Sequence, residues 1–82
     1  MTNTKSRFYC TIAAYNTGSG NVARAFTNKT NFSEASREIN KLTPDEVYET
    51  LMKKLPYDET KHYLKKVKER IDSYELFLKT TT

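Results

Sequence analysis

The first apolar run of the chain has the spacing of a helix. In the segment SRFYCTIAAY the apolar side chains gather on one broad side, at Phe8, Cys10, Ile12, Ala13 and Tyr15. This period predicts an α-helix, and Ser6 is a residue type that caps helix N-termini. The segment NTGSG follows. We expect Gly18 and Gly20 to end the helix, because glycine tolerates backbone angles that side chains oppose.

Two shorter segments repeat this pattern. NVARAF predicts a short helix that Ser19 can cap, and the polar segment TNKTN is typical of a connector. EASREINKL predicts a further helix capped by Ser33. The inner side of that helix is expected at Ala35, Ile39 and Leu42.

The strongest local signal is the tetrapeptide TPDE. It places Thr43 at the N-cap, Pro44 at the first helical position and Glu46 at the third. The side chains of Thr43 and Glu46 can therefore each bond to the backbone amide of the other residue. We expect a helix from Pro44 to Leu55, which Pro56 ends. Its buried side is expected at Val47, Tyr48, Leu51 and Met52.

A long amphipathic segment follows, for which Asp58 can serve as the cap. Its apolar stripe alternates steps of three and four residues, at Leu64, Val67, Ile71, Tyr74 and Leu78. Tyr63 and Phe77 widen this stripe. Because no run of alternating apolar and polar residues exceeds a few positions, we expect an all-α fold of about four to five helices without strands.

Composition narrows the class of protein. With 82 residues the chain forms at most one domain, and a chain of this size buries only roughly 60% of its unfolded surface. A mean hydropathy of −0.79, with 37% hydrophobic and 29% charged residues, is typical of a globular domain in water. No apolar run approaches the roughly 20 residues of a membrane span. The sequence therefore predicts no membrane contact by this segment.

The net charge and the single cysteine and histidine give little information about function. The net charge of +4 allows an acidic partner such as nucleic acid, anionic lipid or an acidic glycan. However, the cations of the last helix alternate with Glu59, Glu69 and Asp72, which favours a solvated helix face. Without a helix-turn-helix pattern or an acid-free basic cluster, we expect no nucleic-acid partner. Cys10 and His62 are single representatives of their types. We therefore expect an inert buried thiol, a surface imidazole, and no metal or cofactor.

Tyr15 and Asn16 lie where the first predicted helix meets the glycine turn. One explanation is structural: the tyrosine ring packs inward and the asparagine stops the helix. The other comes from the run AAYNTGSGNVARAF. It resembles the Ala-Tyr-Asn-x-Gly-x-Gly motif of lytic murein transglycosylases, lysozyme-like enzymes that cut bacterial cell-wall glycan.

The resemblance extends through two further blocks. The Thr-Pro-x-(Asp/Glu)-Val-Tyr helix start of the family is matched by Thr43, Pro44, Glu46, Val47 and Tyr48. Its Glu-Thr-x-x-Tyr-(Leu/Val) helix is matched by Glu59, Thr60, Tyr63 and Leu64. The similarity runs from about Ser6 to Val67 and is strongest to membrane-bound members of the family. It implies the C-terminal portion of a lysozyme-like helical domain.

The resemblance also implies roles for the residues of the first block. In this family one glutamic acid protonates the oxygen between MurNAc and GlcNAc, and an anhydro-muramyl product forms. That acid must stay protonated near neutral pH, and Tyr15 would orient it without adding charge. Asn16 and the turn at Gly18 would form part of the substrate-binding cleft. Tyr63 would either contact glycan or pack in the core, and Glu59 would either bind substrate or serve the first turn of its helix.

The proton donor of the family has no counterpart in this sequence. In the family it precedes the Ala-Tyr-Asn motif, whereas the first acidic residue here is Glu34. We therefore expect residues 1–82 to be the C-terminal segment of a catalytic domain, an excised fragment or a natural remnant, and inactive alone. The helix bearing Phe8, Ile12 and Tyr15 would then lack its covering helices, which predicts self-association through that helix, or its repacking.

Three functions therefore compete. The chain is part of a peptidoglycan lyase that acts on glycan strands, a non-catalytic module that holds sacculus fragments or another wall enzyme, or a small basic nucleic-acid binder. The resemblance favours the first, and the basic final helix and the tyrosines would provide the binding surface of the second. It also implies a parent protein in the periplasm or attached to the outer membrane, although the chain carries no targeting signal of its own.

Overall fold

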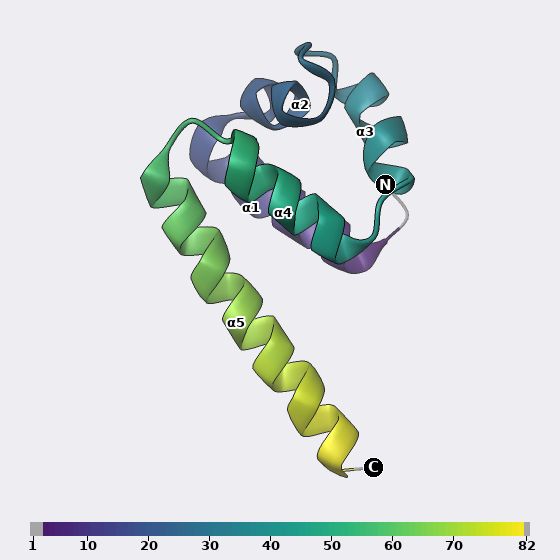
Figure 1. Cartoon of the computed structure of the whole chain (residues 1–82), viewed down its shortest axis with the longest axis vertical. Coiled ribbons are helices and arrows are strands. Elements are labelled where there is room, and N and C mark those ends of the chain that lie inside the picture. Colours follow the sequence, from purple (N-terminus) through teal and green to yellow (C-terminus); the bar gives the residue numbers. More distant parts are fainter. Residues whose placement is uncertain (1–2, 82) are drawn as a thin grey trace.

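A computed structural model describes residues 3–81 and shows five α-helices, with no strand among these residues (Figure 1). The helices are α1 (Thr4–Thr17), α2 (Ser19–Thr27), α3 (Phe32–Asn40), α4 (Pro44–Lys54) and α5 (Asp58–Thr81). The expectation of an all-α fold is confirmed. Helices α1 to α4 form a body, and α5 projects beyond it as one long rod (Figure 1). The molecule measures 43 × 26 × 18 Å.

The core gathers side chains from all five helices. Its buried members are Tyr9, Cys10, Ala13, Val22, Ala23, Ala35, Ile39, Val47, Tyr48, Leu51, Leu55 and Leu64. The rings of Tyr9 on α1 and Tyr48 on α4 have centroids 5.7 Å apart and planes tilted by 57°, a favourable geometry for an aromatic pair. Helix α1 lies in the middle of this arrangement, because it contacts α2, α4 and α5.

Helix α1 carries apolar residues on two sides, and the structure buries only one of them. The inner side consists of Ser6, Tyr9, Cys10 and Ala13. The outer side is open: Phe8 is 48% exposed and Tyr15 is 91% exposed. This outer side is the one expected to lose its covering helices. The periodicity did not identify Tyr9 as a core residue, because apolar residues occur on both sides of the helix.

For α1 and α3 the predicted serine caps are wrong, and in both helices an asparagine is the cap. Ser6 lies inside α1, where its backbone N–H donates to Oδ1 of Asn3 at 3.1 Å. Likewise the Ser33 N–H donates to Oδ1 of Asn31 at 2.9 Å, so Asn31 caps α3. Asparagine and serine are about equally good caps. The residue that directly precedes the first helical turn therefore becomes the cap, and in both helices that residue is the asparagine.

The glycine turn after α1 needs only one of its two glycines. Gly18 ends α1 with φ +90°, a backbone angle that side chains rarely adopt, and its N–H donates to the Ala14 carbonyl at 2.7 Å. Gly20, by contrast, lies within α2 at ordinary helical angles. Ser19 is the first residue of α2 and makes no capping bond. The expected roles of Gly20 and Ser19 are therefore wrong.

The predicted start of α4 is confirmed in full. The Glu46 N–H donates to Oγ1 of Thr43 at 3.2 Å, and the Thr43 N–H donates to the Glu46 carboxylate at 2.9 Å. Leu55 adopts an extended ψ of 140° before Pro56, so the helix stops at Lys54. The Pro56–Tyr57 turn then leads into α5, whose first helical residue is Asp58. Asp58 therefore lies inside the helix that it was expected to cap.

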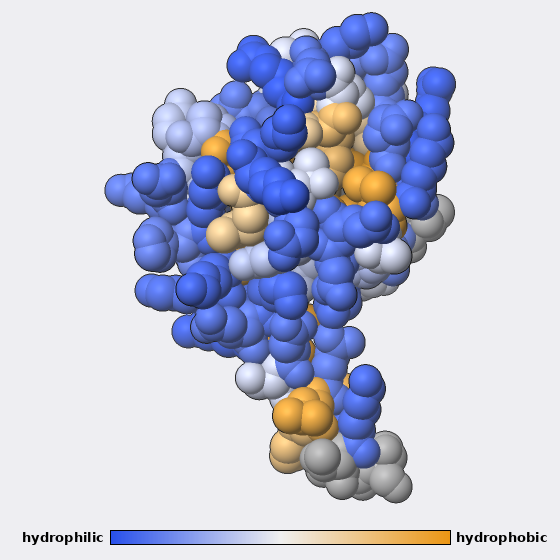
Figure 2. All heavy atoms as spheres, viewed as in Figure 1, coloured by the Kyte–Doolittle hydropathy of each residue, from blue (hydrophilic) through white to orange (hydrophobic). Residues whose placement is uncertain are grey.

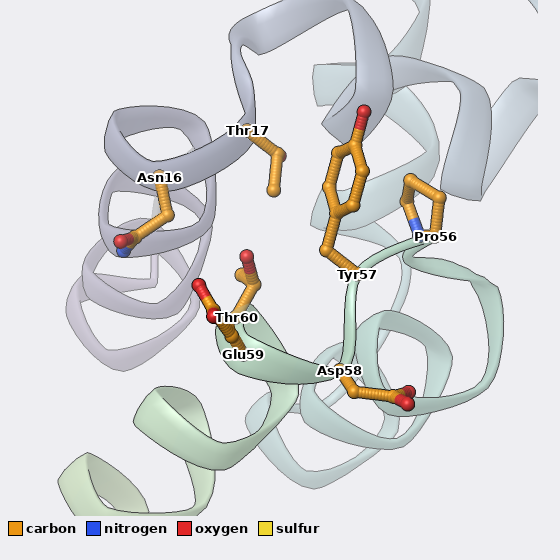
Figure 3. A pocket seen from close by; sticks show the side chains of 7 residues that line it. All are labelled: Asn16, Thr17, Pro56, Tyr57, Asp58, Glu59 and Thr60. Atoms are coloured by element: carbon orange, nitrogen blue, oxygen red, sulfur yellow. The ribbon is translucent and has the colours of Figure 1, made fainter.

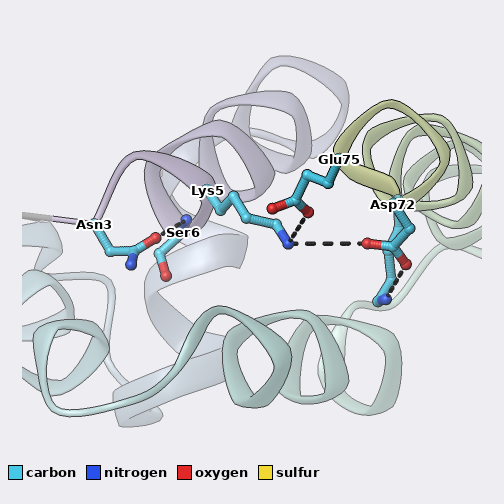
Figure 4. Close-up of polar contacts among 6 residues, drawn as sticks. Asn3, Lys5, Ser6, Asp72 and Glu75 are labelled. Carbon is cyan, nitrogen blue, oxygen red and sulfur yellow. Dashed lines mark hydrogen bonds and ion pairs between the residues drawn. The ribbon is translucent and has the colours of Figure 1, made fainter. Parts of the chain in front are cut away.

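Helix α5 lies antiparallel to α1 and is held to it by charges. Nζ of Lys5, near the start of α1, lies 2.7 Å from Glu75 and 3.8 Å from Asp72, as Figure 4 shows. Lys68 reaches Asp72 at 2.6 Å and lies 5.3 Å from the ring centroid of Tyr48. The hydrogen bond to Glu75 raises the pKa of Lys5, and the one from Lys68 lowers the pKa of Asp72. The contacts of Lys5 therefore join the start of α1 to the second half of α5.

The surface reflects this uneven packing. The face in Figure 2 is mostly hydrophilic, with apolar patches on the body and near the far end of α5. Of the predicted α5 stripe, Leu64 is buried while Tyr74 is 64% exposed, because the body does not extend along the whole helix. None of the helices described for residues 3–81 is both long and apolar enough to cross a membrane.

Candidate functional site

The end of α1 and the start of α5 bring three predicted site residues together. Tyr15, Asn16 and Tyr63 line one pocket of about 300 Å³ together with Thr11 and Ile12. The volume lies at the lower end of the range of small-ligand sites. Because α1 and α5 are far apart in the sequence, the antiparallel docking of the two helices creates this pocket.

Both tyrosines of the pocket keep their rings in solvent. Tyr15 is 91% exposed and Tyr63 is 54% exposed. The structural explanation for Tyr15, a ring packed inward, is therefore wrong for this arrangement. Tyr63 likewise lies outside the core of the described residues, since more than half of it meets water. Exposed aromatic rings around a small pocket suit a ligand that offers an apolar face and hydroxyl groups.

Of the predicted site residues Asn16 and Gly18, only Asn16 lines this pocket. The Asn16 side-chain amide donates to the Ile12 carbonyl at 2.9 Å, which fixes the side chain at the pocket wall. Asn16 is otherwise exposed at the end of the helix. Gly18 does not line the pocket. A Cβ at that position would meet no atom within 4 Å, so the need for glycine comes from its φ alone.

A second pocket adjoins the first through Asn16. It has a volume of about 700 Å³ and is formed by Asn16 and Thr17 on one side and the segment Pro56, Tyr57, Asp58, Glu59 and Thr60 on the other. In Figure 3 Thr17, the Tyr57 ring and the Thr60 hydroxyl point toward the space between the helices, whereas Asp58 points away. The two pockets form a groove along the junction of α1 and α5, which we call the α1–α5 groove.

Sequence reasoning missed Thr17, Tyr57 and the pocket-facing role of Thr60. Tyr57 belongs to the α4–α5 turn and has no place in a helical period. The available signal was an aromatic residue between a helix-ending proline and a helix start. Such a residue is not required for the packing of either helix, so it can face a ligand. Thr60 was noted only as part of the family block, and Thr17 only as part of the turn.

The cysteine and histidine lie apart. Cys10 is 1% exposed, and burial raises the pKa of its thiol to about 12, which suppresses the nucleophilic thiolate. His62 is exposed and lines a different surface hollow with Lys61 and Lys65. Over residues 3–81, no group of three or more His, Cys, Asp or Glu side chains lies close enough to hold a metal ion.

Comparison with known proteins identifies relatives of this groove-bearing chain. No protein-family profile matches it. Membrane-bound lytic murein transglycosylase C of Photorhabdus laumondii subsp. laumondii is 46% identical over 67 residues, which cover 82% of this chain. The protein of the same name from Cronobacter sakazakii is 45% identical over 67 residues. The chain is homologous to a segment of lytic murein transglycosylase C.

This homology confirms the family resemblance that the sequence motifs indicated. The matched segment is 18% of the length of each lytic murein transglycosylase C, so the chain spans about a fifth of these curated relatives. Both relatives are named as membrane-bound, which describes the complete proteins.

Proposed function

We propose that the α1–α5 groove binds peptidoglycan glycan strands, as part of a lytic transglycosylase domain that cleaves the MurNAc–GlcNAc bond with formation of an anhydro-muramyl product. One observation carries the proposal: Tyr15 and Asn16 of the Ala-Tyr-Asn motif share a pocket with Tyr63 of the Glu-Thr-x-x-Tyr block. Residues from two motifs that are far apart in the sequence thus line one pocket large enough for a small ligand.

Tyr15 is proposed to orient the acid that donates the proton. Tyr15 lines the open pocket, and its hydroxyl adds no charge beside a carboxyl group that must remain protonated. Among the described residues, the lining of this pocket holds no carboxylate. Glu59 lines the adjoining pocket but is exposed, so it lacks the desolvation that such a donor requires. The acid is therefore expected from another segment of the domain.

The remaining assignments follow from this arrangement. Asn16 is proposed to meet the polar groups of the sugar, Tyr63 to contact a sugar face, and Gly18 to shape the end of α1. Residues 1–82 would act as the C-terminal segment of the catalytic domain and be inactive alone. A parent protein acting on murein would work in the cell envelope, in the periplasm or attached to the outer membrane.

The alternative is a non-catalytic module that binds peptidoglycan or a wall protein. It is supported by the same exposed tyrosines and by a groove lining that lacks a buried acid. The two functions differ in what happens when the missing acid is provided. A catalytic segment gains activity when it is joined to a donor-bearing segment of a relative, whereas a binding module does not.

The binding step is tested by NMR titration of the full chain with chitobiose and a muropeptide. We expect shifts at Tyr15, Asn16 and Tyr63, and we expect Tyr15→Ala to remove most of them. Tyr74→Ala is the matched control, because Tyr74 is exposed on α5 outside the groove. The chain should release no anhydro-muropeptides from sacculi. Shifts confined to residues 61–70 would instead indicate electrostatic binding and contradict the proposal.

A further inference from the structure

The elbow between α1 and α2 lies directly beside the candidate site. Tyr15, Asn16 and Thr17 end α1, and each of them lines a pocket of the α1–α5 groove. Gly18 then separates the two helices with φ +90° and ψ 148°. The carbonyl groups of a last helical turn lack partners within their own helix. The orientation of these site residues therefore depends on the contacts that hold this turn.

Asn21 provides a hydrogen bond across the elbow. It lies in the first turn of α2, and its Nδ2 donates to the carbonyl of Thr17, the last residue of α1, at 2.8 Å. Its Oδ1 accepts from the Arg24 guanidinium at 3.4 Å. In the described part of the chain, no other side-chain hydrogen bond joins α1 to α2. The Asn21 amide thus ties the end of α1 to the start of α2.

Two other side chains strengthen the same turn from within α1. The Asn16 amide donates to the Ile12 carbonyl at 2.9 Å, and Oγ1 of Thr17 donates to the Ala13 carbonyl at 2.9 Å. Because both bonds stay inside α1, they do not set its direction relative to α2. Asn21 lines neither pocket of the groove. Any effect of Asn21 on binding must therefore act through the end of α1.

We propose that Asn21 is a positioning residue of the α1–α5 groove. Its bond to the Thr17 carbonyl holds the last turn of α1, and with it the side chains of Tyr15 and Asn16, in the orientation that binds ligand. Such preorganisation raises affinity, because less conformational freedom is lost on binding. The inference rests on the proposed glycan function.

Asn21→Asp tests the donor with almost no change of shape. A carboxylate cannot donate to the Thr17 carbonyl, although it can still accept from Arg24. The melting temperature should be retained, because the first turn of a helix favours negative charge. Chitobiose binding should weaken roughly threefold to tenfold. Asn21→Gln keeps an amide donor and should recover part of this loss. If Asn21→Asp fails to fold, Asn21→Ala gives the same comparison with a good helix former.

Hydrogen exchange of the free protein measures the turn directly. The Gly18 N–H donates to the Ala14 carbonyl at 2.7 Å, so its exchange rate reports how often the end of α1 opens. Asn21→Asp should raise this rate roughly threefold to tenfold, the effect of one hydrogen bond. It should also move the NMR signals of Tyr15 and Asn16 before any sugar is added.

Thr50→Val is the matched control. Oγ1 of Thr50 donates to the Glu46 carbonyl at 2.9 Å, a bond between a side chain and the backbone four residues earlier, as in Asn21. Thr50 lies on α4 and lines neither pocket of the groove. Its substitution should leave both Gly18 exchange and chitobiose binding unchanged. Equal losses in the two variants would indicate general destabilisation and overturn the positioning role.

Two failures can be told apart. If wild type binds chitobiose and Asn21→Asp binds it equally well, or if Gly18 exchange is unchanged, the positioning role is wrong and the glycan function stands. If wild type binds neither chitobiose nor a muropeptide, the proposed function fails and the positioning role fails with it.

Discussion

The two sides of α1 differ in every property that packing controls. Tyr9 and Ala13 on the inner side are fully buried against the neighbouring helices. Tyr15 on the outer side is 91% exposed and lines the α1–α5 groove. One short helix therefore carries part of the core on one side and the candidate site on the other. Substitutions on the two sides should separate into effects on stability and effects on binding.

The largest expected effect comes from removing a core ring. Tyr9→Ala leaves a cavity beside Tyr48, and such substitutions destabilise by about 3–5 kcal/mol. This approaches the whole stability of a small domain. Tyr15→Ala should change the free energy of unfolding by less than about 0.5 kcal/mol, because the ring makes little buried contact. Urea unfolding followed by circular dichroism compares the two. Equal destabilisation would refute the division between the sides.

The next effect concerns association through the outer side. Phe8, Ile12 and Tyr15 leave apolar surface open to solvent, which favours self-association at high concentration. Phe8→Ser should weaken any dimer by roughly tenfold, while Tyr74→Ser on the far part of α5 should not. Sedimentation velocity over a range of concentrations measures this. A compact monomer at every concentration would show that the open side needs no partner.

The helix caps show why some features could be predicted from the sequence and others could not. The Thr43–Glu46 capping box was predicted correctly because both partners lie within one helical turn. The caps at Asn3 and Asn31 were missed because a serine of similar capping strength follows each, and sequence does not fix the first turn to within two residues. Local signals therefore identify helices more reliably than they identify helix ends.

The groove depends on information of another kind. The proximity of Tyr15 and Tyr63 follows from the docking of α1 on α5, which no helical period encodes, and only the family resemblance suggested it. The buried position of Tyr9 was missed for a related reason, since apolar residues occur on both sides of α1. Tyr57 carried no periodic signal at all. Tertiary docking decides which apolar side becomes core and which becomes site.

A smaller effect is expected from the Tyr9 hydroxyl. It is completely buried and has no hydrogen-bond partner in the described part of the chain. An unsatisfied buried hydroxyl destabilises the folded state, so Tyr9→Phe should stabilise the protein by about 1 kcal/mol while keeping the ring pair with Tyr48. Tyr15→Phe, at an exposed position, should be neutral. A loss of stability in Tyr9→Phe would reveal a partner for the hydroxyl in solution.

The smallest effect concerns the charges that hold α5 against α1. The hydrogen bond from Lys68 of the same helix and the charge of Lys5 on α1 both lower the pKa of Asp72. This carboxylate therefore stabilises the fold above the ordinary carboxyl pKa of about 4. That stabilisation is lost as the pH falls through the lower pKa of the folded state. Because the Asp72 side chain is 46% exposed, solvent screening limits the effect to a few tenths of a kcal/mol.

Asp72→Asn should therefore lower stability slightly at pH 7 and make the unfolding free energy less dependent on pH between about 2 and 5. Glu38→Gln is a suitable control, because Glu38 pairs with Lys41 on the surface without joining two distant helices. Denaturant titrations at several pH values measure both. If the two variants respond to pH alike, the α1–α5 charges contribute no more than an ordinary surface pair. The docking of α5 on α1 would then depend on apolar side chains in or against the core, such as Leu64 and Ile12.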